Sequence, residues 1–172
     1  DVASADRGVV KEIKEKLDGI GKNQIDPVLN IFLKEFNRKL GFDDKKPEIA
    51  EIERYFAKKG KYEWLKSEYK ARFGKEWIED RPSILLKKQN LAKLLADLDG
   101  TSVDVALSNI TTQIGKYTLD IDGFVSLVKA HLDEQTPGSR FIFFVDEVGQ
   151  FIGKDVHRML SLQTIAEGLI DK

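Results

Sequence analysis

The sequence predicts a mostly α-helical chain that contributes one buried strand to an incomplete α/β domain. Apolar residues recur at intervals of three and four along most of the chain, which indicates seven or eight amphipathic helices. One stretch breaks this pattern: Phe141 to Val145 are five consecutive aromatic or β-branched residues, followed by Asp146 and Glu147. A short run without a polar member is typical of a strand that is buried on both faces, as in a parallel sheet.

The predicted helices have recognisable start and stop signals. Asp26 is a capping residue before a proline at the first helical position, and glycines such as Gly41 and Gly74 follow the apolar stripes. The chain preceding the buried run is expected to form helices over residues 6–17, 27–40, 47–59, 61–73, 82–99, 102–114 and 121–132, with a short helical turn at Trp77 and Ile78.

The remainder of the chain is predicted to form a strand, a loop and a last helix. The turn at residues 136–139 leads into the strand, and Gly149 and Gly153 mark a loop after the acidic pair. The last helix is expected to start near Asp155 and to bury six apolar residues: Met159, Leu160, Leu162, Ile165, Leu169 and Ile170. We therefore divide the chain into a helical segment, 1–135, and a strand–loop–helix segment, 136–172.

The composition limits the possible functions. With 172 residues, 33% charged and 41% hydrophobic, the chain has the size and composition of one globular domain. The net charge of −1 provides no overall field to attract nucleic acid, and the absence of cysteine excludes disulfides and thiolate chemistry. No apolar run approaches the roughly 20 residues that a membrane helix needs. There is no signal-peptide pattern and no initiator methionine, so we expect a cytoplasmic piece of a longer polypeptide.

A single strand that is apolar on both faces needs neighbours. Its ladder groups must be paired and its side chains covered. We expect the neighbouring strands to lie outside this chain.

The acidic pair has the position of a Walker B element in a P-loop ATPase. Functional residues collect beyond the carboxyl ends of strands in open α/β sheets. In such enzymes the aspartate helps to hold Mg²⁺ and a second polar residue positions the attacking water. The alternative is that Asp146 and Glu147 only solvate the end of a core strand. A Walker A motif is absent, because no Gly-Lys pair in the sequence is followed by Ser or Thr.

Other candidate sites are weaker. The sequence Asp120-Ile121-Asp122-Gly123 lacks the glutamate of a calcium loop and is better interpreted as a helix cap. His131 and His157 are isolated and are expected to be surface residues. The aromatic residues of 55–69 lie among lysines, as in single-strand nucleic-acid sites, but their helical spacing favours a core position.

Several stretches resemble the large P-loop ATPase family of the bacterial BREX phage-defence systems, often called BrxC or PglY. The resemblance covers F-V-D-E-V-G-Q-F-I-G at 144–153, the segment 159–169, I-A-E-I-E-R-Y-F-A-K-K-G-K-Y-E at 49–63 and F-N-R-K-L-G-F at 36–42. It implies an AAA-like α/β domain with a helical insertion. Asp146 would be the carboxylate that holds Mg²⁺ through a water, and Glu147 the catalytic carboxylate that polarises the attacking water.

The resemblance also implies cofactors and partners. ATP and Mg²⁺ would bind to the intact protein and not to this chain alone, which lacks the phosphate-binding loop and is expected to be inactive by itself. The expected partners are the rest of the ATPase domain, other defence proteins, further copies of the protein and DNA, without a membrane. Two other functions remain open: a non-catalytic helical interaction module, and a nucleic-acid-binding piece that uses the lysines and aromatic residues of 45–75.

Overall fold

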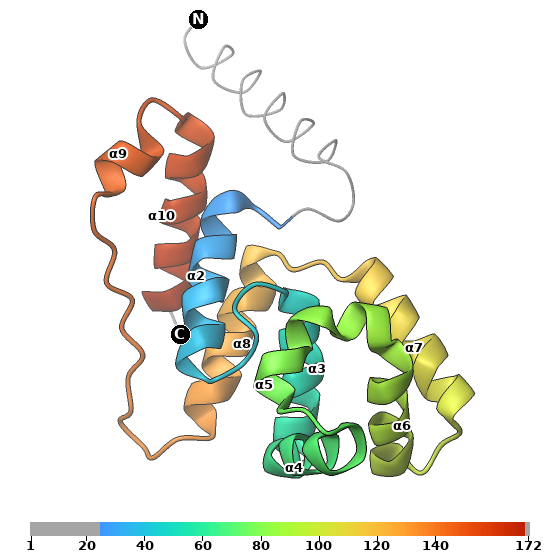
Figure 1. The fold of residues 1–172 in the computed structure, drawn as a ribbon. Helices are drawn as coiled ribbons and strands as arrows, with labels where there is room; N and C mark the ends of the chain where they lie inside the picture. The colour runs from blue at the N-terminus through green and yellow to red at the C-terminus, as the bar shows by residue number, and fades with distance from the viewer. Residues whose placement is uncertain (1–24, 171–172) are drawn as a thin grey trace, which may run out of the picture. The chain divides into compact units, whose positions relative to one another are not determined.

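The computed structural model describes residues 25–170, and within this range the chain is helical (Figure 1). This confirms the prediction of a mostly α chain with seven or eight helices. The helices of 12 to 15 residues are α2 (Pro27–Lys39), α3 (Pro47–Lys58), α4 (Tyr62–Phe73), α6 (Lys88–Asp99), α7 (Val103–Lys116), α8 (Ile121–Asp133) and α10 (Val156–Ile170). The short elements are α5 (Trp77–Asp80), the 3-10 helix η1 (Arg81–Lys87) and α9 (Val148–Ile152). The helix predicted over residues 6–17 lies outside the described residues.

The chain divides into two compact units. The first is Leu33–Tyr117, and the second combines Asp1–Phe32 with Thr118–Lys172, of which residues 25–32 and 118–170 are described. The acidic pair lies in the second unit. Our division of the sequence into 1–135 and 136–172 stays a prediction.

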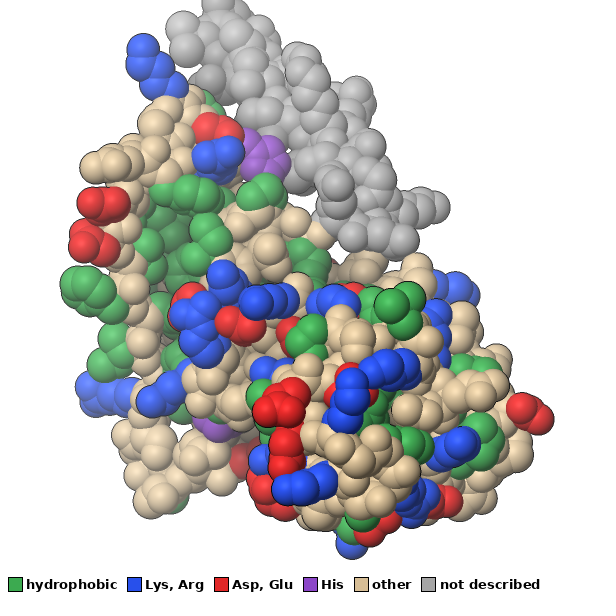
Figure 2. Space-filling model, in the orientation of Figure 1, with side chains coloured by type: hydrophobic (Ala, Val, Ile, Leu, Met, Phe, Trp, Pro, Cys, Tyr) green, Lys and Arg blue, Asp and Glu red, His purple; other side chains and the backbone are tan. Residues whose placement is uncertain are grey.

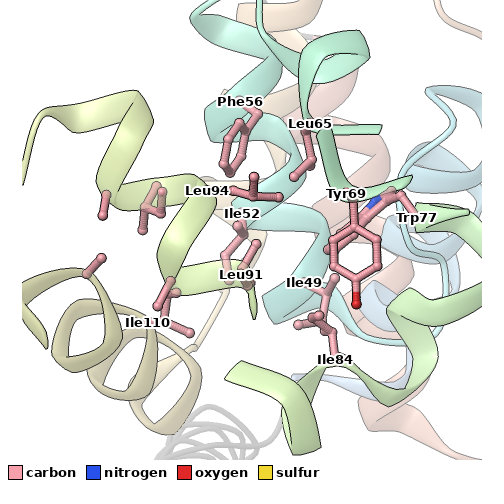
Figure 3. Packing of buried hydrophobic residues seen from close by; sticks show 14 residues of the cluster. Ile49, Ile52, Phe56, Leu65, Tyr69, Trp77, Ile84, Leu91, Leu94 and Ile110 are labelled. Carbon is pink, nitrogen blue, oxygen red and sulfur yellow. The ribbon is translucent and has the colours of Figure 1, made fainter. Parts of the chain in front are cut away.

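The first unit is built around one hydrophobic core (Figure 3). Helices α3 and α6 contribute most of its large aliphatic side chains, and α4 and α5 add the aromatic residues Tyr69 and Trp77. The two rings pack edge to face, with their centroids 5.2 Å apart, and both side chains are fully buried. Burial of side chains of this size contributes about 1.5–3 kcal/mol each, so this core is the main source of stability in the unit.

Local signals set the helix ends as the sequence predicts. Asp26 Oδ1 accepts hydrogen bonds from the backbone N–H groups of Val28 and Leu29, at 2.8 and 3.0 Å. Asp120 Oδ1 accepts from Gly123 N at 2.7 Å, so Asp120 is a helix cap. These contacts satisfy N–H groups that the first turn of a helix leaves unpaired.

The region from Pro82 to Gly100 differs from the single helix that we predict. The chain first forms the 3-10 helix η1, and an α-helix starts only at Lys88. The Asp80 carboxylate bonds to two side chains of η1. It accepts hydrogen bonds from the Ser83 hydroxyl, at 3.1 Å, and from the Lys87 ammonium. These side-chain contacts hold residues 81–87 in a tighter turn than the apolar spacing indicates.

In the second unit, α8 and α10 pack against each other, and α10 runs beside the first turns of α2 (Figure 1). Phe32 and Phe124 are buried between these helices, and Phe143 joins them at ring-centroid distances of 5.2 and 5.9 Å. Phe143 therefore fixes the segment that precedes the acidic pair to this core.

The predicted buried strand is absent from the described residues. Residues 141–147 are assigned to no helix or strand, and Ile142, Phe144 and Val145 make no hydrogen bond with any described part of the chain. Ile142 and Phe144 are 81% and 91% exposed, whereas Phe143 packs inward. Residues 25–170 contain no second strand that could pair with the segment, so its burial on both faces stays a prediction for the intact domain.

The last helix is also less buried than we predict. Of the six apolar residues expected in the core, only Ile165 is buried, and Met159, Leu160 and Ile170 are between 43% and 80% exposed. One side of α10 faces α8, where Gly168 allows close approach to Val125.

Candidate functional site

The acidic pair lies at the start of α9, and both side chains are exposed. Glu147 N donates a hydrogen bond to Asp146 Oδ1 at 2.7 Å. Glu147 has φ 52 and ψ 29, and it is the only non-glycine residue with positive φ in residues 25–170. The left-handed conformation costs an L-residue roughly 1–2 kcal/mol. Strained residues of this kind cluster at functional sites.

The acidic pair borders an apolar hollow of about 290 Å³. Its walls come from α2, from α9 and from Leu162 of α10, and its polar lining residues are Asp146, Glu147 and Gln150. Figure 2 shows hydrophobic side chains gathered in a hollow on this face. The structure thus places Asp146, Glu147 and Gln150 at one rim. Gln150 N also donates to Glu147 O at 3.0 Å, which starts the first turn of α9.

The rim provides carboxylates of the kind that a metal–phosphate site uses. Asp146 Oδ2 makes no hydrogen bond within the described residues, so one oxygen of this carboxylate stays available. Mg²⁺ in phosphate-transfer sites keeps several waters and uses one or two carboxylates together with the phosphates of the substrate. Asp146 and Glu147 fit the carboxylate part of such a site. No group of three or more His, Cys, Asp or Glu residues suited to a metal ion occurs among the described residues.

A second polar cluster joins residues that are far apart in the sequence. The Ser161 hydroxyl donates to Asp26 Oδ2 at 2.9 Å, and His157 Nδ1 lies 3.5 Å from the same hydroxyl and 3.7 Å from Asp26 Oδ2. His157 is half-buried, and its Nε2 atom has no hydrogen-bond partner in the described part of the chain. Our sequence reasoning missed this cluster, because its members are separated by more than 130 residues and lack a shared motif.

Two buried carboxylates organise the first unit. Asp80 is 7% exposed and accepts a hydrogen bond from the Tyr69 hydroxyl at 2.6 Å. The hydrogen bonds from Lys87 and Tyr69 lower the pKa of Asp80 to about 2. Burial and the same contact with Asp80 raise the pKa of Tyr69 to about 12. Asp80 holds its negative charge, and Tyr69 its proton, over the whole neutral range.

Glu53 is fully buried and shares its two carboxylate oxygens among four donors. Oε1 accepts from Trp77 Nε1 at 2.6 Å and from Arg81 Nη1 at 2.9 Å. The Tyr62 hydroxyl donates to the same oxygen at 3.0 Å, and Asp43 N donates to Oε2 at 2.5 Å. Perturbed ionisable groups often mark active sites. Glu53 and Asp80 are instead fully used by protein donors, which is the pattern of structural anchors.

The aromatic residues between 55 and 69 are mainly core residues, as their spacing predicts. Phe56 and Tyr69 are fully buried, and Tyr55 is 37% exposed but donates a hydrogen bond to Asp99. The surrounding basic residues are interspersed with acidic ones on the face that Figure 2 shows, and Lys59 forms an ion pair with Asp99 at 2.7 Å. Phe56 and Tyr69 are therefore not available as the exposed stacking rings that a single-strand groove uses.

No family model matches the chain, and no solved structure matches it. None of the helices within residues 25–170 is both long and apolar enough to cross a bilayer.

Proposed function

We propose that the chain is an internal piece of a P-loop ATPase of the BREX phage-defence type and that it contributes the Walker B carboxylates. The observation that carries the proposal is the acidic pair itself, which directly follows an extended hydrophobic segment and forms the polar rim of a hollow. The resemblance of residues 144–153 and 159–169 to that family supports the same assignment.

The extended segment supports an AAA-like α/β domain in the parent protein. Side chains alternate along it as in a strand, with Phe143 on the helical core and Ile142 and Phe144 exposed. The backbone groups of Ile142 and Phe144 are unpaired within the described residues. Neighbouring strands from the rest of the ATPase domain would supply the missing ladder and cover the two exposed side chains, each worth about 1.5–3 kcal/mol on burial.

The proposed roles follow from the positions of the two carboxylates. Asp146 would hold a water of the Mg²⁺ shell through Oδ2, since Oδ1 already accepts the Glu147 N–H. Glu147 would orient and polarise the attacking water, because the turn at this residue leaves its side chain exposed at the rim. Bound Mg²⁺ supplies neutralisation of the charge that develops on the phosphates. Gln150, at the same rim, is positioned to contact the nucleotide or a neighbouring subunit.

The proposed partners would supply the parts of an ATP site that this sequence does not contain. A phosphate-binding loop and the flanking strands would come from the rest of the same domain, and further copies would complete an ATPase assembly of the AAA type. We place the protein in the bacterial cytoplasm, together with other defence proteins and their DNA target.

The deciding experiment replaces Glu147 in the parent protein. Glu147→Gln should lower the ATP hydrolysis rate by at least 100-fold while nucleotide affinity changes less than threefold, because the substitution removes the carboxylate that polarises water and keeps the side-chain shape. Glu134→Gln is the matched control, since Glu134 is also exposed and lies outside the hollow. Undiminished turnover in the Glu147 variant would refute the proposal.

The two other functions are separable from this one. A nucleic-acid-binding piece predicts DNA affinity that falls steeply with salt concentration, whereas the buried positions of Phe56 and Tyr69 favour no binding. A non-catalytic helical module predicts that the Asp146 and Glu147 variants retain full ATP turnover in the parent protein.

A further inference from the structure

The extended segment between α8 and α9 exposes one face and one backbone edge. Ile142 and Phe144 are 81% and 91% exposed. Phe143, which lies between them, packs on Phe32 and Phe124 of the helical core. The backbone N–H and C=O groups of Ile142 and Phe144 have no hydrogen-bond partner among residues 25–170. Figure 1 shows this segment on the outer side of α10. An unpaired edge beside exposed apolar side chains is a template for pairing with another strand.

The exposed face carries a charge at each end. Side chains alternate along an extended chain, so four exposed residues share this face: Arg140, Ile142, Phe144 and Asp146. In chain direction the face is basic, apolar, apolar and acidic. Such a face is complementary to itself when two copies run antiparallel, because the basic end of each copy then lies opposite the acidic end of the other.

We propose that two copies of this chain associate through residues 140–146 as an antiparallel pair of strands, with a two-fold axis at Phe143. In this register Ile142 of each copy lies opposite Phe144 of the other, and Arg140 lies opposite Asp146. Ile142 and Phe144 form hydrogen-bonded pairs, so the unpaired backbone groups of one copy bond to those of the other. The same residues serve both copies, as in a two-fold interface that closes at a dimer.

The charges and the packing of Phe143 select this register. A parallel pair in register would place Arg140 opposite Arg140 and Asp146 opposite Asp146, and like charges directly opposite are destabilising. An antiparallel pair shifted by one residue would place Phe143 opposite an outward-facing residue, although Phe143 is held on the core. A two-fold axis at Ile142 would place Arg140 opposite Phe144, and an axis at Phe144 would place Asp146 opposite Ile142. The axis at Phe143 pairs both charges.

The dimer goes beyond the proposed ATPase function and does not rest on it. The strands that we expect in the parent protein would compete for the same backbone edge. The oligomeric state of this chain therefore tests the dimer, whereas ATP turnover of the parent protein tests the proposed function.

Charge reversal tests the register in the full chain. Arg140→Glu places two acidic residues opposite each other at both ends of the pair, and Asp146→Lys places two basic residues there. Each variant alone should have a dimer dissociation constant at least about tenfold above that of the natural chain. An equimolar mixture of the two variants should dimerise like the natural chain, because both ends then pair opposite charges. Sedimentation equilibrium over a concentration series measures the constants.

Backbone pairing is tested separately by proline substitution. Phe144→Pro removes an N–H that donates across the pair and should abolish the dimer. Val145→Pro is the matched control, because the N–H of Val145 points to the opposite edge of the strand, and it should leave the dimer intact. Equal loss of the dimer in both variants would contradict the use of this edge. Far-UV circular dichroism verifies that each variant is folded.

Lys129→Glu and Glu134→Lys control for the change in net charge. Both residues are exposed and lie outside the segment, so neither substitution should alter the dissociation constant. A natural chain that stays monomeric at all concentrations would overturn the proposal. Arg140 and Asp146 variants that dimerise as well as the natural chain, or a mixture of the two that stays monomeric, would also overturn it.

Discussion

Glu147 combines an unfavourable backbone conformation with a position at the rim of the hollow. Its φ of 52 is stabilised locally by the hydrogen bond from its own N–H to Asp146 and by the two N–H groups of α9 that bond to its carbonyl oxygen. A residue chosen only for stability at this point would be glycine or asparagine. The carboxylate is thus retained at a cost, which is the pattern expected of a functional side chain.

Replacement of Glu147 by glycine should therefore stabilise the second unit. We expect Glu147→Gly to raise the free energy of unfolding by up to about 1 kcal/mol, because glycine adopts positive φ without a Cβ penalty. Urea denaturation followed by circular dichroism measures the change. Glu134→Gly is the control: Glu134 has φ −84, so glycine there should give no gain. Equal effects at the two positions would show that the conformation of Glu147 is not strained.

The contacts of Asp80 predict a defined pH dependence in the first unit. Its folded pKa of about 2 lies below the usual value of about 3.9, so its stabilising effect is present above pH 4 and is lost as the pH falls toward 2. Asp80→Asn should cost roughly 1–2 kcal/mol at pH 7, and the difference from the natural chain should shrink between pH 4 and pH 2. Denaturation across this range measures it. A difference that is constant with pH would contradict the prediction.

Capping residues are predictable from the sequence because each bonds to a backbone group only two or three positions away. Asp26 and Asp120 act as we expect. The contact of Asp26 with Ser161 and His157 was not predictable, because it depends on how α10 packs beside α2. The acidic pair was found from its sequence context, but the left-handed turn at Glu147 leaves no signal in a single sequence.

At the scale of the elements, the close approach of α8 and α10 depends on Gly168. A Cβ at this position would lie 2.9 Å from Val125 Cγ2, and Val125 is a buried, β-branched side chain that has little freedom to move. Gly168→Ala should therefore destabilise the second unit by about 1–2 kcal/mol, despite the better helix propensity of alanine.

Gly149→Ala is the matched control for this prediction. Gly149 lies within α9, and no atom lies within 4 Å of the Cβ that alanine would add. This substitution should be neutral or stabilising by up to about 1 kcal/mol. Thermal denaturation followed by circular dichroism compares the two variants. Unchanged stability of the Gly168→Ala variant would show that α8 and α10 can separate without cost.

Helical elements were predictable where the apolar periodicity agreed with a start or stop residue, such as Pro47 in α3, Gly74 after α4 and Asp120 before α8. Whether Phe141 to Val145 form a strand could not be predicted, because a strand needs a partner strand and the sequence does not show whether one is present. Phe141 to Val145 keep the extended form that their composition favours, without the ladder. In the same way, the apolar residues of α10 were expected to be buried, but their number exceeds what one packed face can cover.

At the scale of the whole molecule, the two units differ in how much apolar surface they cover. The first unit contains both tryptophans, Trp64 and Trp77, and a large contiguous core. The second unit leaves Ile142, Phe144 and several residues of α10 exposed. Because hydrophobic burial dominates folding stability, the second unit should be the less stable of the two.

This difference predicts denaturation curves that do not coincide. Tryptophan fluorescence reports only the first unit, whereas far-UV circular dichroism reports helices of both. We expect the circular dichroism signal to begin to fall at a lower urea concentration than the fluorescence signal. Gly168→Ala should move only the earlier part of the curve. Superimposable curves would indicate that the units unfold as one cooperative structure.

The run Phe141 to Val145, which exposes Ile142, Phe144 and Val145, also determines how this chain behaves when it is produced on its own. A five-residue window of high β-propensity without charge or proline, with an unpaired backbone at Ile142 and Phe144, is the type of segment that nucleates cross-β aggregation. Arg140 and the two carboxylates at its ends act as charged gatekeepers that slow this process. Asp146 and Glu147, which we propose as Walker B carboxylates, would thus have a second effect: together with Arg140 they would limit amyloid formation while the segment lacks a partner strand.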